Sequence, residues 1–372
     1  MRVLIDYRSA LRNPSGVGLW VSKLVEALAE ASGPGTPDVT VFSSSWKDRL
    51  SPRLLPTGVT TIDRRVPVRV LNWLWHRYEW PTVEALTQQE FDVVHSPTPL
   101  LIPSRRAAKV VTIHDLDFLT HPAHTTREIR RDYPSLARAH AHRAHAVVVP
   151  SHYTADRVAK RFGLPRDRIT VCPNGRPDWP DRTRPTAGRH LLFVGTIGRR
   201  KNVDGLLSAY AALRAARANT PPLVLVGRPD TGANVTLERL QRSPLAGHVN
   251  VTGYVDTPRL RALYEEAVMV VMPSLDEGFG IPALEGMTTG VPVVAADRGA
   301  LPEVVGDAGI LVDPSNIAAL TDAMRRILDD ESLRRRLSIA GRERSARFTW
   351  RSSAATLNEA YTRALVSRNR GS

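Results

Sequence analysis

The stretch from Val268 to Met287 reads VMVVMPSLDEGFGIPALEGM. It begins with a continuous apolar run, passes through an acidic, glycine-rich segment and ends in a helical pattern. Pro282 falls in the first helical turn, where the fixed φ of proline is favoured. An apolar run without alternation indicates a strand covered on both faces, as in a parallel sheet. The stretch therefore predicts the strand–loop–helix unit from which doubly wound α/β folds are built.

The same alternation of short apolar runs and amphipathic segments covers most of the 372 residues. In the first half we expect strands in RVLIDYR, VTVFS, DVVHS, KVVTIHD and AVVVPS, which begin at Arg2, Val39, Asp92, Lys109 and Ala146. In the second half we expect them in RHLLFVG, PLVLVGR, HVNVTGYV, VMVVMPS, VPVVAAD and AGILVD. Helices are expected from Leu19 and over 202–217, 236–242, 258–266 and 281–289. Strands that alternate with helices predict parallel sheets.

One segment interrupts this pattern. PNGRPDWPDRTRPTAG, residues 173–188, holds four prolines and two glycines without periodicity, which is typical of a connector. We therefore predict an α/β protein with an N-terminal Rossmann-like domain (1–172), a linker (173–188), a C-terminal Rossmann-like domain (189–347) and a final helix within 348–372. Two such sheets would face each other across a cleft at their carboxyl edges, where ligands usually bind.

Composition sets the broad class. The chain is 42% hydrophobic and 24% charged, as expected of a soluble globular protein. Its single cysteine, Cys172, excludes an intramolecular disulfide and a cysteine-based zinc site, and favours a reducing compartment. The N-terminal apolar run is too short for a signal peptide, and no stretch is long enough to span a membrane. We expect a cytoplasmic protein, either free or peripheral at the membrane face.

The charge is unusual. Lys and Arg number 51 against 37 Asp and Glu, a net charge of +14. Such a field attracts nucleotides, nucleic acid or anionic membrane, although an arginine-rich composition can also reflect the genome. The Arg-rich stretch from Thr126 to His145 either meets anionic lipid or a phosphorylated acceptor or is a solvated helix face, and Pro134 predicts that it forms two pieces. The sequence shows no helix-turn-helix, zinc-finger or RNA-binding aromatic motif.

The glycine-rich loop carries the chemistry. Glu277 lies on the loop and Glu285 about one turn inside the helix, so each can accept two hydroxyl hydrogen bonds, as a sugar or ribose requires. Backbone N–H groups around Gly278 to Gly280 would lie at a helix N-terminus, which favours anionic oxygens. The alternative is that Glu277 only complements the helix dipole and Glu285 is solvated. The strand–loop–helix context favours the binding site.

This stretch resembles the signature of retaining glycosyltransferases of family four, which have the GT-B fold and an E-x7-E pattern in the C-terminal domain. Other segments agree in order. They are NPSGVG (13–18), TIHDLDFL (112–119), PSHYT from Pro150, CPNG from Cys172 and FVGTIGRRKN (193–202). The last of these resembles the diphosphate segment of the family. The resemblance therefore spans nearly the whole chain.

The resemblance implies a division of roles. Glu285 would bind the ribose, Arg200 and Lys201 the diphosphate, and Glu277 with the following loop the transferred sugar, while His114 would reach that sugar from the N-terminal domain. The implied catalytic residues are His114, Glu277, Arg200 and Lys201. The implied donor-binding residues are Gly16, Gly18, Gly195, Thr196, Gly278, Phe279, Gly280, Ile281 and Glu285, and Asp115 lies on the acceptor side. The last helix would cross back to the N-terminal domain.

Chemistry supports these roles independently. Cleavage of a sugar–diphosphate bond leaves negative charge that positioned cations stabilise. Each residue also has a plainer interpretation: Arg199 to Lys201 as a solvated helix start, Gly16 and Gly18 as a turn, and His114 as a core histidine. Ser151 is predicted to be an N-cap.

The clustering of histidines raises the question of a metal site, because seven of the eleven lie between His114 and His152. These include His121 and His124. His140, His142 and His145 have spacings that do not bring them to one helix face. We therefore expect no metal and no cofactor beyond the nucleotide sugar as co-substrate.

The expected activity is retaining transfer of a hexose or deoxyhexose from a nucleoside-diphosphate sugar to an acceptor hydroxyl. GDP-mannose is favoured because the G-T-x-x-x-R-K-N segment resembles that of mannosyl- and deoxyhexosyl-transferring members. The acceptor would be a glycan, a lipid-linked saccharide or a natural-product aglycone. The alternatives are a nucleotide-sugar epimerase or hydrolase of the same fold and, further off, a basic nucleic-acid-binding protein.

Overall fold

The computed structural model describes residues 1–11, 16–31, 33, 35–120, 122, 125, 127–180, 188–230 and 232–371. Residues 13–15 of the predicted glycine loop, His121, His124, Thr126 and residues 181–187 of the predicted linker lie outside this set. Contacts divide the chain into two compact units. The first comprises Met1–Gly175 and Thr349–Ser372, and the second Arg176–Phe348.

The first unit is built on a parallel sheet of order β3-β2-β1-β4-β5-β6-β7. Its central strands are buried apolar runs, and Val3 of β1 lies opposite Val39 on one side and Val93 on the other. The strands are β1 (Arg2–Asp6), β2 (Asp38–Ser44), β3 (Thr60–Arg64), β4 (Val93–Ser96), β5 (Ala108–Thr112), β6 (Ala146–Val149) and β7 (Ile169–Val171). The two edge strands, β3 and β7, lie outside the predicted strand runs.

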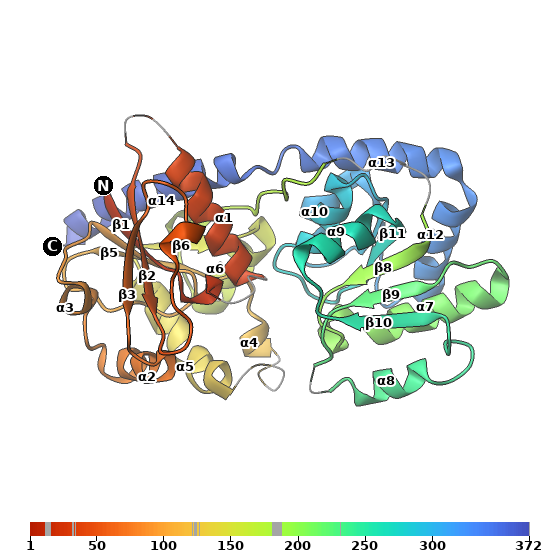
Figure 1. Ribbon diagram of the computed structural model, residues 1–372, viewed down its shortest axis with the longest axis horizontal. Helices are drawn as coiled ribbons and strands as arrows, with labels where there is room; N and C mark the ends of the chain where they lie inside the picture. Colours follow the sequence, from red (N-terminus) through yellow and green to blue (C-terminus); the bar gives the residue numbers. More distant parts are fainter. Residues whose placement is uncertain are drawn as a thin grey trace. The chain divides into compact units, whose positions relative to one another are not determined.

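Helices cover both faces of this sheet (Figure 1). They are α1 (Val17–Glu30), α2 (Val68–Tyr78), α3 (Val83–Thr87), α4 (Asp117–Thr120), α5 (Arg127–Arg143), α6 (His152–Phe162) and α14 (Trp350–Gly371). The predicted N-cap is confirmed, because the Ser151 side chain accepts a hydrogen bond from Thr154 N. The prediction that Pro134 divides the Arg-rich segment is wrong. Pro134 lies inside the single helix α5, whose inner face packs Ala137 and Ala141 into the core.

The second unit contains a six-stranded parallel sheet of order β10-β9-β8-β11-β12-β13. Its strands are β8 (His190–Val194), β9 (Leu223–Val226), β10 (Val249–Gly253), β11 (Ala267–Met272), β12 (Val293–Ala296) and β13 (Ile310–Val312). Its helices are α7 (Val203–Ala216), α8 (Asn234–Leu240), α9 (Thr257–Glu265), α10 (Ile281–Thr288), α11 (Leu301–Val305), α12 (Ile317–Asp329) and α13 (Glu331–Ser345). All six strands fall in the predicted runs, and the predicted α/β class with two Rossmann-like sheets is confirmed.

The ends of the connector pack into the two units. Trp179, within the predicted linker, lies against Tyr264 with ring centroids 5.5 Å apart, so residues from Arg176 onward belong to the second unit. Helix α14 belongs to the first unit, where it packs on α1 and on β5 (Figure 1). Tyr361 of α14 is fully buried there, and Ser353 Oγ donates to the Pro173 carbonyl at 2.6 Å.

Of the helices in the described part of the chain, none combines the length and apolar character that crossing a membrane demands.

Candidate active site

The loop between β11 and α10 has the conformation that its glycines allow. Gly280 is the N-cap of α10 and has a φ of 107°, in the left-handed region. A Cβ at this position would also lie 2.6 Å from Leu301 Cδ2. As a glycine, Gly280 gives α10 no side-chain cap, and Pro282 in the first turn has no N–H to satisfy. Gly278 and Phe279 are buried beside this turn, and Ile281 is half-buried.

Glu277 is the most tightly held side chain of the loop. It is 6% exposed and accepts hydrogen bonds from Lys201 Nζ and, at 2.9 Å, from Ser274 Oγ. The Arg200 guanidinium lies 3.8 Å from its second oxygen. Burial opposes ionisation, but the charges of Lys201 and Arg200 outweigh it and lower the pKa of Glu277. Glu277 is therefore a buried, ionised carboxylate rather than a solvated helix acid.

Arg200 and Lys201 come from a 3-10 turn, Arg199–Lys201, between β8 and α7. The turn is tied to the β11 loop, because Leu275 N donates to the Arg200 carbonyl at 2.9 Å and Arg200 Nη1 donates to the Asp276 carbonyl at 3.2 Å. Lys201 is 9% exposed and lies over Gly195, where a Cβ would be 3.4 Å from Lys201 Cε. The plainer interpretation, a solvated helix start, fits the exposed Arg199 but not Lys201.

Thr196, which follows Gly195 at the carboxyl end of β8, is exposed. The residues of the cluster therefore follow the carboxyl ends of two strands, β8 and β11. Doubly wound sheets bind their ligands at this edge. It presents two cations, one ionised carboxylate and the start of a helix.

Glu285 lies in a different environment. It is the fifth residue of α10, is 6% exposed and accepts a hydrogen bond of 2.7 Å from the Tyr264 hydroxyl. Burial raises the pKa of Glu285 to about 7, and the hydrogen bond from Tyr264 offsets only part of that effect. The E-x7-E pair thus contains one carboxylate held ionised by cations and one whose charge is disfavoured by burial. The solvated interpretation of Glu285 does not hold.

His114 in the first unit lies two residues beyond the end of β5. Its Nε2 atom is buried and finds no partner among the described residues, while the ring makes a hydrogen bond with the Pro97 carbonyl. Nδ1 is therefore the donor, and Nε2 is an acceptor. Burial lowers the pKa of His114 to about 4, so the ring is neutral near pH 7. An unsatisfied buried acceptor is a position at which a ligand hydroxyl would gain a hydrogen bond.

His95 provides the comparison. This buried histidine makes 2.8 Å hydrogen bonds through Nδ1 with the Tyr361 hydroxyl and through Nε2 with Thr112 Oγ1. His95 is therefore a core histidine with both ring nitrogens satisfied. The plainer interpretation given above for His114 describes His95 instead. Trp20 contacts the edges or faces of both rings, with centroids 5.9 Å from His95 and 5.0 Å from His114.

The other predicted residues of this unit have local structural roles. Gly16 is the N-cap of α1 with a φ of 56°, which favours glycine. A Cβ at Gly18 would lie 2.4 Å from the Ser9 carbonyl oxygen, so close packing alone demands a glycine there. The Asp115 side chain accepts a hydrogen bond of 3.1 Å from Asp117 N at the start of α4.

The clustered histidines are held separately by backbone groups. His140 Nδ1 accepts from Leu101 N at 2.9 Å, His142 Nε2 lies 2.7 Å from the Phe162 carbonyl, and His145 Nδ1 accepts from Lys109 N at 3.0 Å.

Comparisons with known proteins identify the family. Residues 178–344 match the family model described as glycosyl transferases group 1, and residues 14–178 match the model described as glycosyltransferase family 4. The O-antigen chain mannosyltransferase B of Escherichia coli is 30% identical over 74% of this chain and 76% of its own length. The chain belongs to glycosyltransferase family 4. The MMP α-(1→4)-mannosyltransferase of Mycolicibacterium hassiacum is 29% identical over 98% of this chain and 99% of its own length.

Solved structures give the same fold. Sucrose-phosphate synthase from Thermosynechococcus elongatus has a TM-score of 0.75 at 21% identity, covering 97% of this chain and 98% of that one. HepE of Anabaena, solved with UDP and glucose, has a TM-score of 0.69 at 19% identity, covering 97% and 99%. This family 4 glycosyltransferase therefore has the GT-B fold predicted for it.

Two residues of the cluster were missed from the sequence. Ser274 lies inside the quoted stretch, three residues before Glu277, and its hydroxyl could have been noticed there. Tyr264 is 21 residues before Glu285, in α9, and only the packing of α9 against β11 brings its hydroxyl to the carboxylate.

Proposed function

We propose that this glycosyltransferase transfers a hexosyl or deoxyhexosyl group from a nucleoside-diphosphate sugar to an acceptor hydroxyl, with retention of configuration. The observation that carries the proposal is the cluster of half-buried Arg200 with buried Lys201 and Glu277. A second buried carboxylate, Glu285, follows eight residues after Glu277. Cations beside an ionised carboxylate suit a ligand that carries both phosphate and sugar hydroxyls.

Each group has a distinct task. Arg200 and Lys201 would bind the diphosphate and stabilise the charge that develops on its leaving oxygen. Glu277, which the cations keep ionised, would accept hydrogen bonds from hydroxyls of the transferred sugar. Glu285 would accept hydrogen bonds from the ribose. His114 offers a neutral acceptor, Nε2, for a hydroxyl group of the sugar.

The proposed reaction needs no covalent intermediate. Glu277 is already engaged by Lys201, Arg200 and Ser274, which makes it a poor nucleophile. In the front-face route, the acceptor oxygen bonds to the anomeric carbon as the bond to the phosphate oxygen breaks. The acceptor proton passes to the departing phosphate. The products are the nucleoside diphosphate and a glycoside of unchanged anomeric configuration.

GDP-mannose is the proposed donor, and a glycan, a lipid-linked saccharide or an aglycone the proposed acceptor. The mannosyltransferase names of two relatives support the sugar. The structure of HepE with UDP and glucose supports a nucleotide-sugar donor but favours a different base. The donor panel below distinguishes these bases.

Contact with anionic lipid is a further part of the proposal. Helix α2 presents Arg69, Trp73 and Arg77 on its exposed side, and Trp73 is 43% exposed. Its neighbour α5 is joined to it by a hydrogen bond of 2.7 Å between His76 Nδ1 and Asp132 Oδ2. Exposed aromatic and basic side chains on adjacent helices suit a headgroup region.

The test is transfer of radiolabelled sugar from a panel of nucleotide sugars, with wild-type protein and Glu285→Ala. Glu238→Ala, an exposed acid of the same unit, is the matched control. We expect Glu285→Ala to raise the donor KM strongly and Glu238→Ala to leave it unchanged. Normal kinetics in Glu285→Ala would overturn the site. Consumption of the donor at the same rate with and without any acceptor would favour the hydrolase or epimerase alternative.

A further inference from the structure

The first unit contains a cavity of about 810 Å³ that the proposed transfer reaction does not use. Its lining includes Arg2 at the start of β1, Asp92 just before β4, Lys109 near the start of β5 and His145 just before β6. These strands are parallel, so the cavity lies at the amino edge of the sheet. His114 follows the opposite, carboxyl end of β5. The cavity is therefore separate from the edge that carries the candidate site residues.

The charges that line the cavity are mostly positive. Five are cations (Arg2, Arg105, Arg106, Lys109 and Arg368) and two are acids (Glu90 and Asp92). Both acids are already engaged by protein groups. Glu90 pairs with the Arg106 guanidinium, and Asp92 accepts a 2.7 Å hydrogen bond from Arg2 N. The cations that line the cavity therefore outnumber the acids, which favours an anionic ligand.

Lys109 gives the sharpest indication. Its side chain is half-buried, and its ammonium makes neither an ion pair nor a hydrogen bond with the described residues. Burial, and then the nearby Arg143, lower the pKa of Lys109, although Glu79 and Glu84 act in the opposite direction. Lys109 itself lines the cavity, so this half-buried cation adds to the positive charge that an anion there would meet.

His145 adds a donor beside it. Since its Nδ1 accepts a hydrogen bond from Lys109 N at 3.0 Å, the neutral ring carries its proton on Nε2. Burial lowers the pKa of His145, and Lys109, Arg168 and Arg368 lower it further, as expected in a positive field. Lys109 N and the Lys109 carbonyl both bond to His145, which fixes the two residues together.

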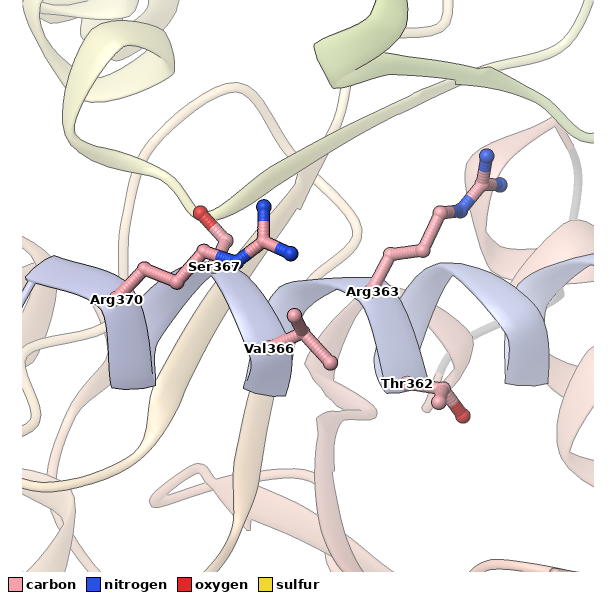
Figure 2. A pocket seen from close by; sticks show the side chains of 5 residues that line it. All are labelled: Thr362, Arg363, Val366, Ser367 and Arg370. Carbon is pink, nitrogen blue, oxygen red and sulfur yellow. The ribbon is translucent and has the colours of Figure 1, made fainter.

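Arg368 brings the C-terminal helix to the same cavity. Its Nη1 donates to the Arg106 carbonyl at 2.7 Å, which ties α14 to the loop before β5. Residues of α14 also line a smaller pocket of about 330 Å³. Figure 2 shows Arg363, Ser367 and Arg370 projecting there from one side of the helix. Arg363 is engaged by Thr170 Oγ1 at 3.1 Å, and this pocket is lined by two cations against five in the larger cavity.

We propose that the cavity at the amino edge of the first sheet binds a small oligophosphate anion, at a site separate from the sugar donor. Several cations from different elements suit a ligand with several phosphate oxygens, and guanidinium groups match phosphate geometry. The cavity has the size of a small-molecule site. A bound oligophosphate would join α14 to β1 and β5 and hold the C-terminal end of α14 in place.

The test titrates the full chain with inorganic triphosphate at low salt, by calorimetry. Arg200→Ala serves as the parent, so that the proposed donor site contributes little phosphate binding. Arg105→Gln with Arg368→Gln removes two cations of the cavity. Arg65→Gln with Arg161→Gln, both exposed in the same unit, is the matched control. We expect the first pair to weaken binding at least about tenfold, because each lost contact is a charge-assisted hydrogen bond. The control pair should change it less than about twofold.

A second readout guards against misfolding. Triphosphate should slow amide hydrogen exchange in the last turns of α14 in the parent and in the control pair, but not in the Arg105/Arg368 pair. ATP and inorganic triphosphate should compete with each other if phosphate is the group recognised. Equal triphosphate affinity in all variants, or preference for a DNA duplex over triphosphate, would overturn the proposal. Nucleoside-diphosphate binding and its loss in Glu285→Ala are measured separately, so the donor site and this cavity can fail independently.

Discussion

Replacing Glu285 with glutamine should stabilise the protein and weaken its function. The Glu285 carboxyl is 6% exposed, and burial raises its pKa to about 7 from an ordinary value of 4.5. An acid with a raised pKa in the folded state binds protons more readily when folded. Its contribution to stability is therefore present at pH values below 4.5 and is lost as the pH rises through 7. The neutral amide of glutamine avoids that loss and can still accept the hydrogen bond from Tyr264.

The size of the effect follows from linkage. With those two pKa values, Glu285→Gln should gain about 3 kcal/mol over wild type at pH 8 and only about 1 kcal/mol at pH 5. In a unit of this size, each kcal/mol raises the Tm by roughly 2–4 °C. The difference should appear in the calorimetric transition of the second unit, with Glu238→Gln as an exposed control. A Glu285→Gln protein that melts at or below the wild-type Tm at pH 8 would refute the buried, proton-binding carboxyl.

Three further substitutions test the surrounding contacts. Lys201→Met should destabilise the second unit by about 3–5 kcal/mol, because it leaves Glu277 buried beside a more distant cation, and adding Glu277→Gln should recover most of that loss in urea denaturation. Failure of the double variant to recover would contradict the buried pair. Tyr264→Phe removes the hydroxyl that orients Glu285, and should raise the donor KM severalfold with kcat little changed, whereas an unchanged KM would mean that the hydroxyl only fills space. Trp73→Ser should reduce co-sedimentation with phosphatidylglycerol vesicles severalfold, and equal binding would exclude α2 as the lipid contact.

Much of the fold was predictable because its strands are continuous apolar runs. All six strands of the second sheet lie in such runs. Four of its helices, α7 to α10, were predicted, and each begins within two residues of its predicted start. Strands β3 and β7 were missed because edge strands need less apolar sequence. The β3 run TTIDR is mostly half-exposed, and β7 has only three residues. The single helix α5 was missed because the local effect of Pro134 was given more weight than the packing of the helix.

The candidate site was predictable in its residues but not in its electrostatics. Glycines, acids and basic residues in a strand–loop–helix order are visible in the sequence. The opposite pKa shifts of Glu277 and Glu285 are not, because the first depends on Lys201 and Arg200, which are distant in sequence, and the second on the burial of Glu285 in the folded unit. Similarly, sequence alone could not distinguish His95 from His114. Hydrogen bonds satisfy both ring nitrogens of the first, while Nε2 of the second lacks a partner in the described part of the chain.

The most direct test of the central claim is nucleotide binding by the purified full chain. Thermal shifts would be measured with GDP, UDP, dTDP and ADP and with their sugar conjugates, for wild type, Glu285→Ala and Glu238→Ala. A ligand that binds the native state raises the Tm. The account predicts a selective shift with one diphosphate, GDP if the proposed donor is right, that persists in Glu238→Ala and disappears in Glu285→Ala. If no diphosphate shifted the Tm of the wild-type protein, the assignment of this cluster to a nucleotide-sugar donor would be contradicted.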